Sequence, residues 1–404
     1  MPPDPLTPGQ LGPVLLRNRF VKAATFEGMS PAGVPSPALV EHHRRLAEGG
    51  VGMTTVAYAA VHPDGRTFPD QLCLVPSAIP ALRSLTHAVH EAGARVSIQL
   101  AHAGFFSKLR PADGGLPRGP SLTFNKYGAA SGLPLARAMT VAEIEAIPGQ
   151  FAAAAELVAE AGFDAVELHL GHGYLLSQFL SPATNRRRDR YGGSPDGRMR
   201  LPLAVARAVR EAVGGRLAVT AKLNVLDGFS GGAGVAEAVA LAGRLDAAGI
   251  DGLTTSGGST SRNPLFLLRG ERPLAAMIAV ERSALQRVAL RVLGPAVLRT
   301  YPFEETFFRE PGRELLAHVG CSVILLGGVV SWANAVQAMA DGFAFVQMGR
   351  ALLADPDLVR RFERGEAQRT RCTACNQCIA AMDDGGVRCV LDDPGGRFVL
   401  RHPA

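Results

Sequence analysis

Lysine is scarce in this chain: 38 of its 42 basic residues are arginine and only four are lysine. The formal net charge of +6 therefore reflects abundant arginine, and no cluster of arginines with interleaved aromatic residues is present. Nucleic-acid-binding surfaces usually carry a basic cluster, so we expect no nucleic-acid partner. The chain also lacks any uninterrupted apolar run near the ~18 residues that a membrane-spanning helix needs.

The first residues lack the charged segment and apolar core of a secretion signal. We therefore expect a cytoplasmic protein with no membrane partner. Hydrophobic residues make up 47% and charged residues 19% of the 404 residues, which is ordinary for a globular protein. This length suits one large barrel with additional segments, or two modest domains.

Apolar, strand-like runs alternate with amphipathic stretches along the chain. Eight strand–helix units predict an α/β fold, a closed parallel (β/α)8 TIM barrel. A doubly wound sheet is the alternative, but its first strand should lead into a glycine-rich turn, which is missing here. The expected strands are 20–26, 51–60, 94–101, 164–170, 216–224, 250–256, 321–327 and 343–348. Amphipathic stretches include 37–48, 141–161, 198–213 and 236–248.

Three segments depart from this repeat. Residues 259–312, rich in Arg, Leu and Pro, interrupt the sixth unit and suggest an inserted cap. Residues 105–139 form a long loop after the third strand, and long loops at this rim of a barrel are usually functional. We therefore expect residues 1–360 to form the barrel and residues 361–404 to form a short cysteine-rich C-terminal extension.

The densest group of reactive side chains follows the fourth expected strand. His169, His172 and Tyr174 lie within six residues, where an apolar run meets glycines. TIM barrels place their active sites at the C-terminal ends of the strands, so we expect these side chains to face a reaction site. Two imidazoles and a phenol can bind an oxygen anion and deliver a proton. A structural role is one alternative; a zinc site is another, but it would need a third ligand at a recognisable spacing.

Other candidates also lie at strand ends. Lys222 sits inside the fifth strand, where it either pairs with a carboxylate or faces an electron-rich ring and stabilises negative charge there. Gln99, on the third strand, can offer a donor and an acceptor to the same ring. The glycine pair ending at Gly328, together with Gly349 and Arg350, can surround a phosphate, with simple turns as the alternative.

Several stretches resemble the Old Yellow Enzyme family, which comprises FMN-dependent ene-reductases and related NADH:flavin oxidoreductases. The resemblance covers nearly the whole chain, and the stretch 179–194 is its most specific part. The matching stretches are Arg17-Asn-Arg-Phe20, Gln99-Leu-Ala-His-Ala-Gly104, His169-x-x-His172-x-Tyr174, residues 179–185 with 189–194, and residues 349–356.

The resemblance implies an FMN on the barrel rim, reduced by NAD(P)H and reoxidised by a small α,β-unsaturated substrate. His169 and His172 would bind the carbonyl oxygen of the substrate, and Tyr174 would donate a proton. The flavin would contact Gln99 and Lys222 and approach the backbone near Thr25. Its phosphate would be held by Gly328, Gly349 and Arg350.

Three residues depart from the family pattern. Family members often carry Cys, Thr or Ser where Phe26 stands, and that position tunes the flavin. They commonly have Arg at the position of Phe105 and Asn at that of Gly197.

Four cysteines near the C-terminus have the spacing C-x2-C-x2-C-x10-C: Cys372, Cys375, Cys378 and Cys389. This is similar to the [4Fe–4S] ligand set of two long relatives, trimethylamine dehydrogenase and 2,4-dienoyl-CoA reductase. Spacing alone does not separate an iron–sulfur cluster from a zinc ion or a metal-free tail. With a cluster, electrons would be exchanged with a separate carrier protein; without one, NAD(P)H would serve the flavin directly.

The favoured hypothesis is an NAD(P)H-dependent reductase of carbonyl-conjugated C=C bonds. One alternative is an FMN/iron–sulfur amine dehydrogenase or demethylase, but that enzyme has tyrosine at the position of His169. A flavin-free barrel with a binding role is another, and an isomerase or aldolase acting through Lys222 is the last. A homo-oligomer is compatible with each.

Overall fold

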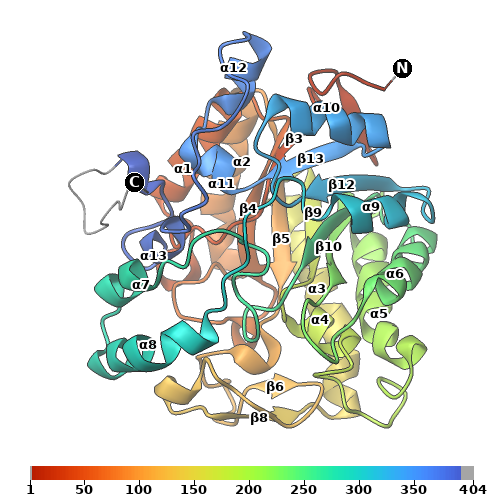
Figure 1. Cartoon of the computed structure of the whole chain (residues 1–404). Coiled ribbons are helices and arrows are strands. Elements are labelled where there is room, and N and C mark those ends of the chain that lie inside the picture. Colours follow the sequence, from red (N-terminus) through yellow and green to blue (C-terminus); the bar gives the residue numbers. More distant parts are fainter. Residues whose placement is uncertain (1, 393–404) are drawn as a thin grey trace.

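Eight parallel strands close into a barrel in this computed structural model, which describes residues 2–392 (Figure 1). Each expected strand overlaps one barrel strand, so the predicted (β/α)8 barrel is confirmed and the doubly wound sheet is excluded. In spatial order the strands are β3 (Phe20–Lys22), β4 (Met53–Ala60), β5 (Arg95–Ala101), β9 (Ala165–Leu170), β10 (Ala218–Leu226), β11 (Gly252–Gly257), β12 (Ser322–Leu326) and β13 (Phe345–Met348).

Helices follow the strands and cover the outside of the barrel. Several begin at a Ser or Thr whose side chain accepts a hydrogen bond from the first turn, as Ser36, Thr140, Ser194 and Ser331 do. The helices are α1 (Pro37–Glu48), α2 (Ile79–Glu91), α3 (Val141–Glu160), α4 (Leu175–Leu180), α5 (Pro195–Val213), α6 (Val235–Ala247), α9 (Arg309–Leu316), α10 (Trp332–Asp341), α11 (Arg350–Ala354) and α12 (Leu358–Glu363).

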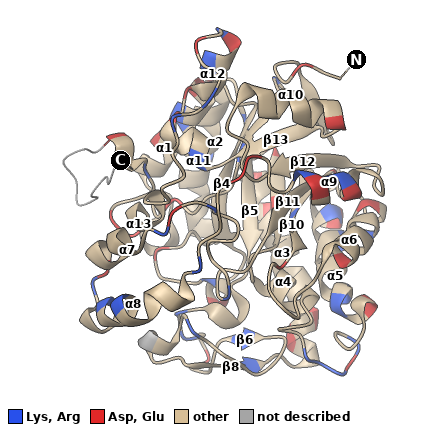
Figure 2. Ribbon diagram, in the orientation of Figure 1, with Lys and Arg blue, Asp and Glu red and all other residues tan. Residues whose placement is uncertain are grey.

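Basic and acidic residues are interspersed on α5, α6 and α9 (Figure 2). Ion pairs between Arg198 and Glu237 and between Arg244 and Asp196 connect α5 with α6. Among the described residues, no helix combines the length and the apolar character that crossing a membrane requires.

The barrel interior changes from apolar to polar along its axis. At the N-terminal end, an antiparallel hairpin of β1 (Gly9–Leu11) and β2 (Val14–Leu16) buries Leu11 and Leu16 against the lowest interior side chains. Because residues two apart on a strand point the same way, Ala165 at this apolar level is followed on β9 by Glu167 and then by His169. The polar and reactive side chains thus lie toward the C-terminal ends of the strands.

The long loop after β5 contains a small sheet of its own. Its strands are β6 (Arg118–Gly119), β7 (Thr123–Phe124) and β8 (Leu135–Ala138), with β8 in the middle. Short 3-10 turns lie in this loop and elsewhere: Pro31–Gly33, Pro63–Gly65, Pro76–Ala78, Gly104–Phe106, Ala129–Ser131 and Val390–Asp392.

The segment expected as a cap contains α7 (Leu274–Val280) and α8 (Ala284–Val297). Its expected end at residue 312 falls inside α9, a helix of the barrel repeat that already begins at Arg309. The arginine-rich composition of the cap continues into this helix, so composition alone does not mark the boundary. In the C-terminal extension, α13 (Cys378–Ala381) packs against α7, and residues 393–404 lie outside the described residues.

Candidate active site

The two predicted histidines lie side by side at the end of β9. The Nε2 atom of His169 is 2.8 Å from the Nδ1 atom of His172, and the Nε2 atom of His172 is 2.6 Å from the hydroxyl oxygen of Ser256. The backbone N–H of His172 donates to the Oδ1 atom of Asn224. His172 adopts a left-handed backbone conformation (φ 60°), which is costly for a residue with a side chain and is often found at functional sites.

Both imidazoles are neutral at physiological pH. Burial lowers the pKa of His169 well below its usual value, and the neighbouring His172 and the Lys222 ammonium lower it further. Burial and Lys222 lower the pKa of His172 to about 3. A neutral imidazole carries one N–H, so the hydrogen bonds around it decide which nitrogen donates. The Nδ1 atom of His169 is buried and has no hydrogen-bond partner among the described residues.

Tyr174 packs directly on this histidine pair. Its ring stacks on that of His169 with centroids 4.1 Å apart, and the edges of Tyr58 and Phe106 enclose it. Burial raises the pKa of Tyr174 well above its usual value, and the neighbouring Tyr58 raises it further, so the phenol stays protonated. Tyr58, whose side chain hydrogen-bonds that of Tyr174, was not predicted. The sequence signal that could have identified Tyr58 as a site residue is its place near the end of the second expected strand.

Lys222 pairs with a carboxylate inside the barrel. This pairing is one of the two roles that the sequence predicts for this lysine. Its Nζ atom lies 2.9 Å from the Oε1 atom of Glu167, and both side chains are buried. The amide of Gln99 donates to the same carboxylate, as do Thr254 and Gln347. An ammonium has three donors, so this pairing leaves Lys222 able to bind a further acceptor.

Glu167 was missed by the sequence analysis. It lies two residues before His169 and therefore on the same face of β9, opposite Gln99 in the strand register. That spacing was the only local signal, because the pairing with Lys222 depends on two strands far apart in sequence.

We expect Glu167→Gln to lower the free energy of unfolding by about 1–3 kcal/mol, because it removes a charged acceptor and leaves the buried Lys222 ammonium unpaired. Urea unfolding measures the change. Glu156→Gln is the matched control, because Glu156 is exposed on α3 and has no ion pair among the described residues. Equal unfolding midpoints for the two variants would contradict a structural role for the Glu167–Lys222 pair.

The residues expected to hold FMN fit that group. The hydroxyl oxygen of Thr25 is buried without a hydrogen-bond partner in the described part of the chain, and Gly349 lies against the same side chain. The backbone N–H groups of Gly328, Gly349 and Arg350 have no acceptor among residues 2–392. Free N–H groups of this kind can bind a phosphate.

The Arg350 side chain, however, is directed toward the cysteine-rich extension. Its Nη1 atom donates to the carbonyl oxygen of Arg269, at 2.9 Å, and to the side chain of Asn376. A phosphate contact from its guanidinium would use the remaining donors, since the group has five.

The four tail cysteines line one small pocket together with Arg350 and Asn376, and none forms a disulfide. Side chains that line the same pocket need not be close enough to one another to coordinate one metal ion. No three His, Cys, Asp or Glu side chains within residues 2–392 are arranged to hold a metal ion. The structure therefore gives no support to bound metal, and the metal site predicted from the spacing of Cys372, Cys375, Cys378 and Cys389 stays a prediction.

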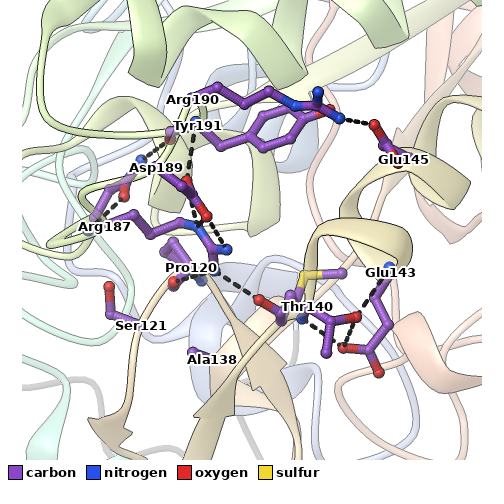
Figure 3. A network of polar contacts seen from close by, with 12 residues as sticks. Pro120, Ser121, Ala138, Thr140, Glu143, Glu145, Arg187, Asp189, Arg190 and Tyr191 are labelled. Atoms are coloured by element: carbon purple, nitrogen blue, oxygen red, sulfur yellow. Dashed lines mark hydrogen bonds and ion pairs between the residues drawn. The ribbon is translucent and has the colours of Figure 1, made fainter.

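The family-like stretch 179–194 has a structural role at this rim. Arg187 donates to the carbonyl oxygens of Pro120 and Met139, at 3.0 and 2.6 Å, and to the carboxylate of Asp189 (Figure 3). It thereby ties the long loop after β5 to the body of the barrel.

The departure from the family pattern at Gly197 has a packing reason, because a Cβ atom there would lie 2.2 Å from the carbonyl oxygen of Gly192.

The other two departures are aromatic. Phe26 packs its ring against those of Tyr58 and Phe68, with centroids 5.5 and 4.9 Å apart. Phe105 donates its backbone N–H to the side chain of Gln178, and its ring lines a pocket at the rim. Neither ring can supply the hydrogen bonds that the usual residues at these positions offer.

Comparison with known proteins decides the family. The profile of the NADH:flavin oxidoreductase / NADH oxidase family matches residues 6–259. The chain belongs to this family. The membership predicted from the sequence motifs is thereby confirmed, and the protein is an NAD(P)H:flavin oxidoreductase that uses FMN.

Relatives of this flavin oxidoreductase differ in length and in the reactions their names describe. It is 41% identical to the 4,4'-dithiodibutanoate disulfide reductase of Rhodococcus erythropolis, over 97% of this chain and 96% of that protein. It is 30% identical to the NADH oxidase of Thermoanaerobacter brockii over 98% of this chain, but spans only 56% of that protein. The structure of morphinone reductase in complex with tetrahydroNAD is similar, with a TM-score of 0.71, 26% identity, and coverage of 92% of this chain and 94% of that chain.

Proposed function

We propose that this flavin oxidoreductase reduces C=C bonds conjugated to a carbonyl group. The observation that carries the proposal is the convergence of the His169 Nε2 and His172 Nδ1 atoms, 2.8 Å apart, beside the protonated Tyr174. When bound, FMN would take two electrons from NAD(P)H and return them to the substrate as hydride.

The histidine pair would bind and polarise the carbonyl group. A carbonyl oxygen that accepts from the His169 Nε2 and His172 Nδ1 atoms replaces the hydrogen bond between the two rings. Both donors draw electron density from the conjugated system and make its β-carbon electrophilic. Because both rings are neutral, each must carry its single proton on the nitrogen that faces the substrate.

Ser256 is placed to select that tautomer. When its hydroxyl donates to the Nε2 atom of His172, the ring proton of His172 resides on Nδ1, facing the substrate. We expect Ser256→Ala to weaken binding of a carbonyl substrate about tenfold, because a neutral hydrogen bond contributes about 0.5–1.5 kcal/mol. The oxidative half-reaction measures the change in substrate affinity. Unchanged affinity, with flavin reduction by NAD(P)H also unchanged, would contradict this role.

Tyr174 would then protonate the α-carbon. The β-carbon gains hydride and the α-carbon gains the phenolic proton, so one two-electron reduction saturates one C=C bond. A protonated donor within reach of the reacting atom is what general acid catalysis requires. The raised pKa of Tyr174 keeps the phenol protonated across the physiological range.

Separate measurement of the two half-reactions under anaerobic conditions tests the proposal. The protein with FMN bound is first reduced by NADH or by NADPH, and the reduced protein is then mixed with cyclohex-2-enone. We expect the enone to restore the oxidised flavin spectrum and to appear as cyclohexanone in equal amount. Reduced flavin that persists in the presence of excess enone would contradict the proposal.

Disulfide reduction is a second candidate, favoured by the 41% identity to the dithiodibutanoate reductase over nearly the full length of both chains. A disulfide that gains hydride and one proton yields two thiols, so the same donors would protonate the departing sulfur. Mixing the reduced protein with 4,4'-dithiodibutanoate instead of the enone separates the two candidates. A C=C reductase should be reoxidised faster by the enone, and a disulfide reductase should be reoxidised faster by the disulfide.

The amine dehydrogenase alternative requires an iron–sulfur cluster in the extension and a carrier protein. The amine enzyme has tyrosine at the position of His169, so the pair of neutral imidazole donors formed by His169 and His172 favours the reductase instead. The cluster stays a prediction that rests on cysteine spacing. Iron and acid-labile sulfide analysis of protein purified without oxygen tests it: about four irons per chain would establish a cluster. One zinc per chain, or no metal, would exclude it.

A further inference from the structure

A pocket of about 570 Å³ lies at the C-terminal rim of the barrel. The segments that follow the four neighbouring strands β5, β9, β10 and β11 line it, and we call it the rim pocket. Pockets that bind small organic molecules commonly have volumes of about 300–1,000 Å³. The rim pocket therefore has room for a substrate-sized molecule.

Two walls of the rim pocket continue directly from the active site. Phe105 lines the pocket, and the next phenylalanine along the chain packs its ring 4.8 Å from that of Tyr174. On the other side, Arg262 lines the pocket two residues after Thr260, whose backbone N–H donates to the carbonyl oxygen of His172 at 2.9 Å. A molecule in the rim pocket would thus be a neighbour of the proposed reacting groups.

All ionisable side chains that line the rim pocket are cations: Lys126, Arg186 and Arg262. None of the three forms an ion pair with a described Asp or Glu, whereas nearby arginines on the same loops do. Those paired arginines are Arg118, Arg137 and Arg187. The rim pocket therefore carries three positive charges that residues 2–392 leave uncompensated.

Two of these cations are held in place without being neutralised. The guanidinium of Arg262 lies 5.0 Å from the ring centre of Phe229, and that of Arg186 donates to the carbonyl oxygen of Leu122. A guanidinium has five donors, so most remain available to a ligand. The apolar part of the lining comes from the aromatic residues Phe105, Phe124 and Phe229 and from Leu122 and Leu135.

We propose that the rim pocket binds the carboxylate end of an elongated substrate with an apolar body, whose reacting end lies at His169 and His172. This inference rests on the proposed function and narrows it to organic anions. The rings would cover the apolar body, and the three cations would bind the carboxylate, since Arg and Lys form charge-assisted hydrogen bonds with such groups.

Three probes separate charge recognition from reduction itself. The first is a cyclohex-2-enone with a four-carbon tail ending in a carboxylate, the second is its methyl ester, and the third is cyclohex-2-enone without a tail. We expect the acid to have a KM at least about tenfold lower than its ester at low salt, and this difference to shrink as salt screens the charges.

The test variant combines Lys126→Gln, Arg186→Gln and Arg262→Gln. We expect its KM for the acid to rise about tenfold or more, with the ester and the tail-free enone within about twofold of the parent protein. The control variant combines Arg188→Gln, Arg282→Gln and Arg291→Gln, which removes the same charge from exposed positions outside the rim pocket. Lys126→Gln alone covers the case in which loss of the Arg186 contacts disturbs folding, because no side-chain hydrogen bond holds Lys126 in the described structure.

Equal losses for the acid and the ester, or equal losses in test and control variants, would overturn the proposal. A loss confined to flavin reduction by NADH or NADPH would assign the cations to the dinucleotide and would also overturn it. If the parent protein reduces none of the enones, the proposed function fails, and calorimetric titration with the saturated acid and its ester still tests the rim pocket. Tighter binding of the acid, lost in the test variant, supports charge recognition; equal binding of both excludes it.

Discussion

Tyr174→Phe is expected to slow reoxidation of the reduced flavin by an enone about 10²-fold or more, because it removes the phenolic proton that lies stacked against His169. Flavin reduction by NAD(P)H should remain within about twofold of the parent protein, since that step needs no proton from the phenol. Stopped-flow absorbance under anaerobic conditions measures the two steps separately.

Tyr301→Phe is the matched control for this prediction. It removes a phenol hydroxyl whose ring packs on Phe266 and, among the described residues, makes no ring contact with Tyr174 or His169. Its effect on reoxidation should be much smaller. Because burial raises the pKa of Tyr174 and lowers those of His169 and His172, the rate with an uncharged enone should also be flat between about pH 6 and 9. Equal loss of both half-reactions in Tyr174→Phe would contradict its role as the acid.

The double variant His169→Ala, His172→Ala should lose about 10²–10³-fold in enone reduction, because two donors to the developing oxygen charge are removed together. It should also lose the long-wavelength absorbance that phenols produce when they bind over an oxidised flavin. Absorbance titration with a phenol reports binding without turnover, so this readout does not depend on the reaction being correctly identified.

His87→Ala is a suitable control for the double variant, because His87 is exposed on α2, far along the chain from β9. It should bind phenol and FMN as the parent protein does. The double variant must also retain FMN, since neither histidine belongs to the residues that fit the cofactor. Phenol binding that survives in the double variant would show that the imidazoles do not hold the oxygen.

The barrel could be predicted because each of its strands is a short apolar run followed by an amphipathic helix. The pattern reflects strands that are buried on both faces, so it can be read without knowing which strands pair. The hairpin that closes the N-terminal end, residues 9–16, could not be predicted in the same way. Its two strands have three residues each, and the reason for them lies in the apolar barrel interior that Leu11 and Leu16 cover.

The candidate site likewise has one part that can be predicted from the sequence and one part that cannot. His169, His172 and Tyr174 are neighbours in sequence, so their meeting follows from the end of one strand. The partners that decide their chemistry come from other strands: Ser256 from β11 and Tyr58 from β4. The direction of the Arg350 side chain likewise depends on Asn376 in the extension, and spacing along the chain carries no information about such contacts.

A crystal structure of the protein with FMN and a bound phenol would show whether the two histidines hold the substrate oxygen. We expect a phenol oxygen between the Nε2 atom of His169 and the Nδ1 atom of His172, with the two rings no longer bonded to each other and the flavin lying beneath the phenol. We also expect the Tyr174 hydroxyl to face the same space. Imidazoles that stay paired while the phenol binds elsewhere, or an FMN remote from Thr25 and Gly349, would contradict this expectation.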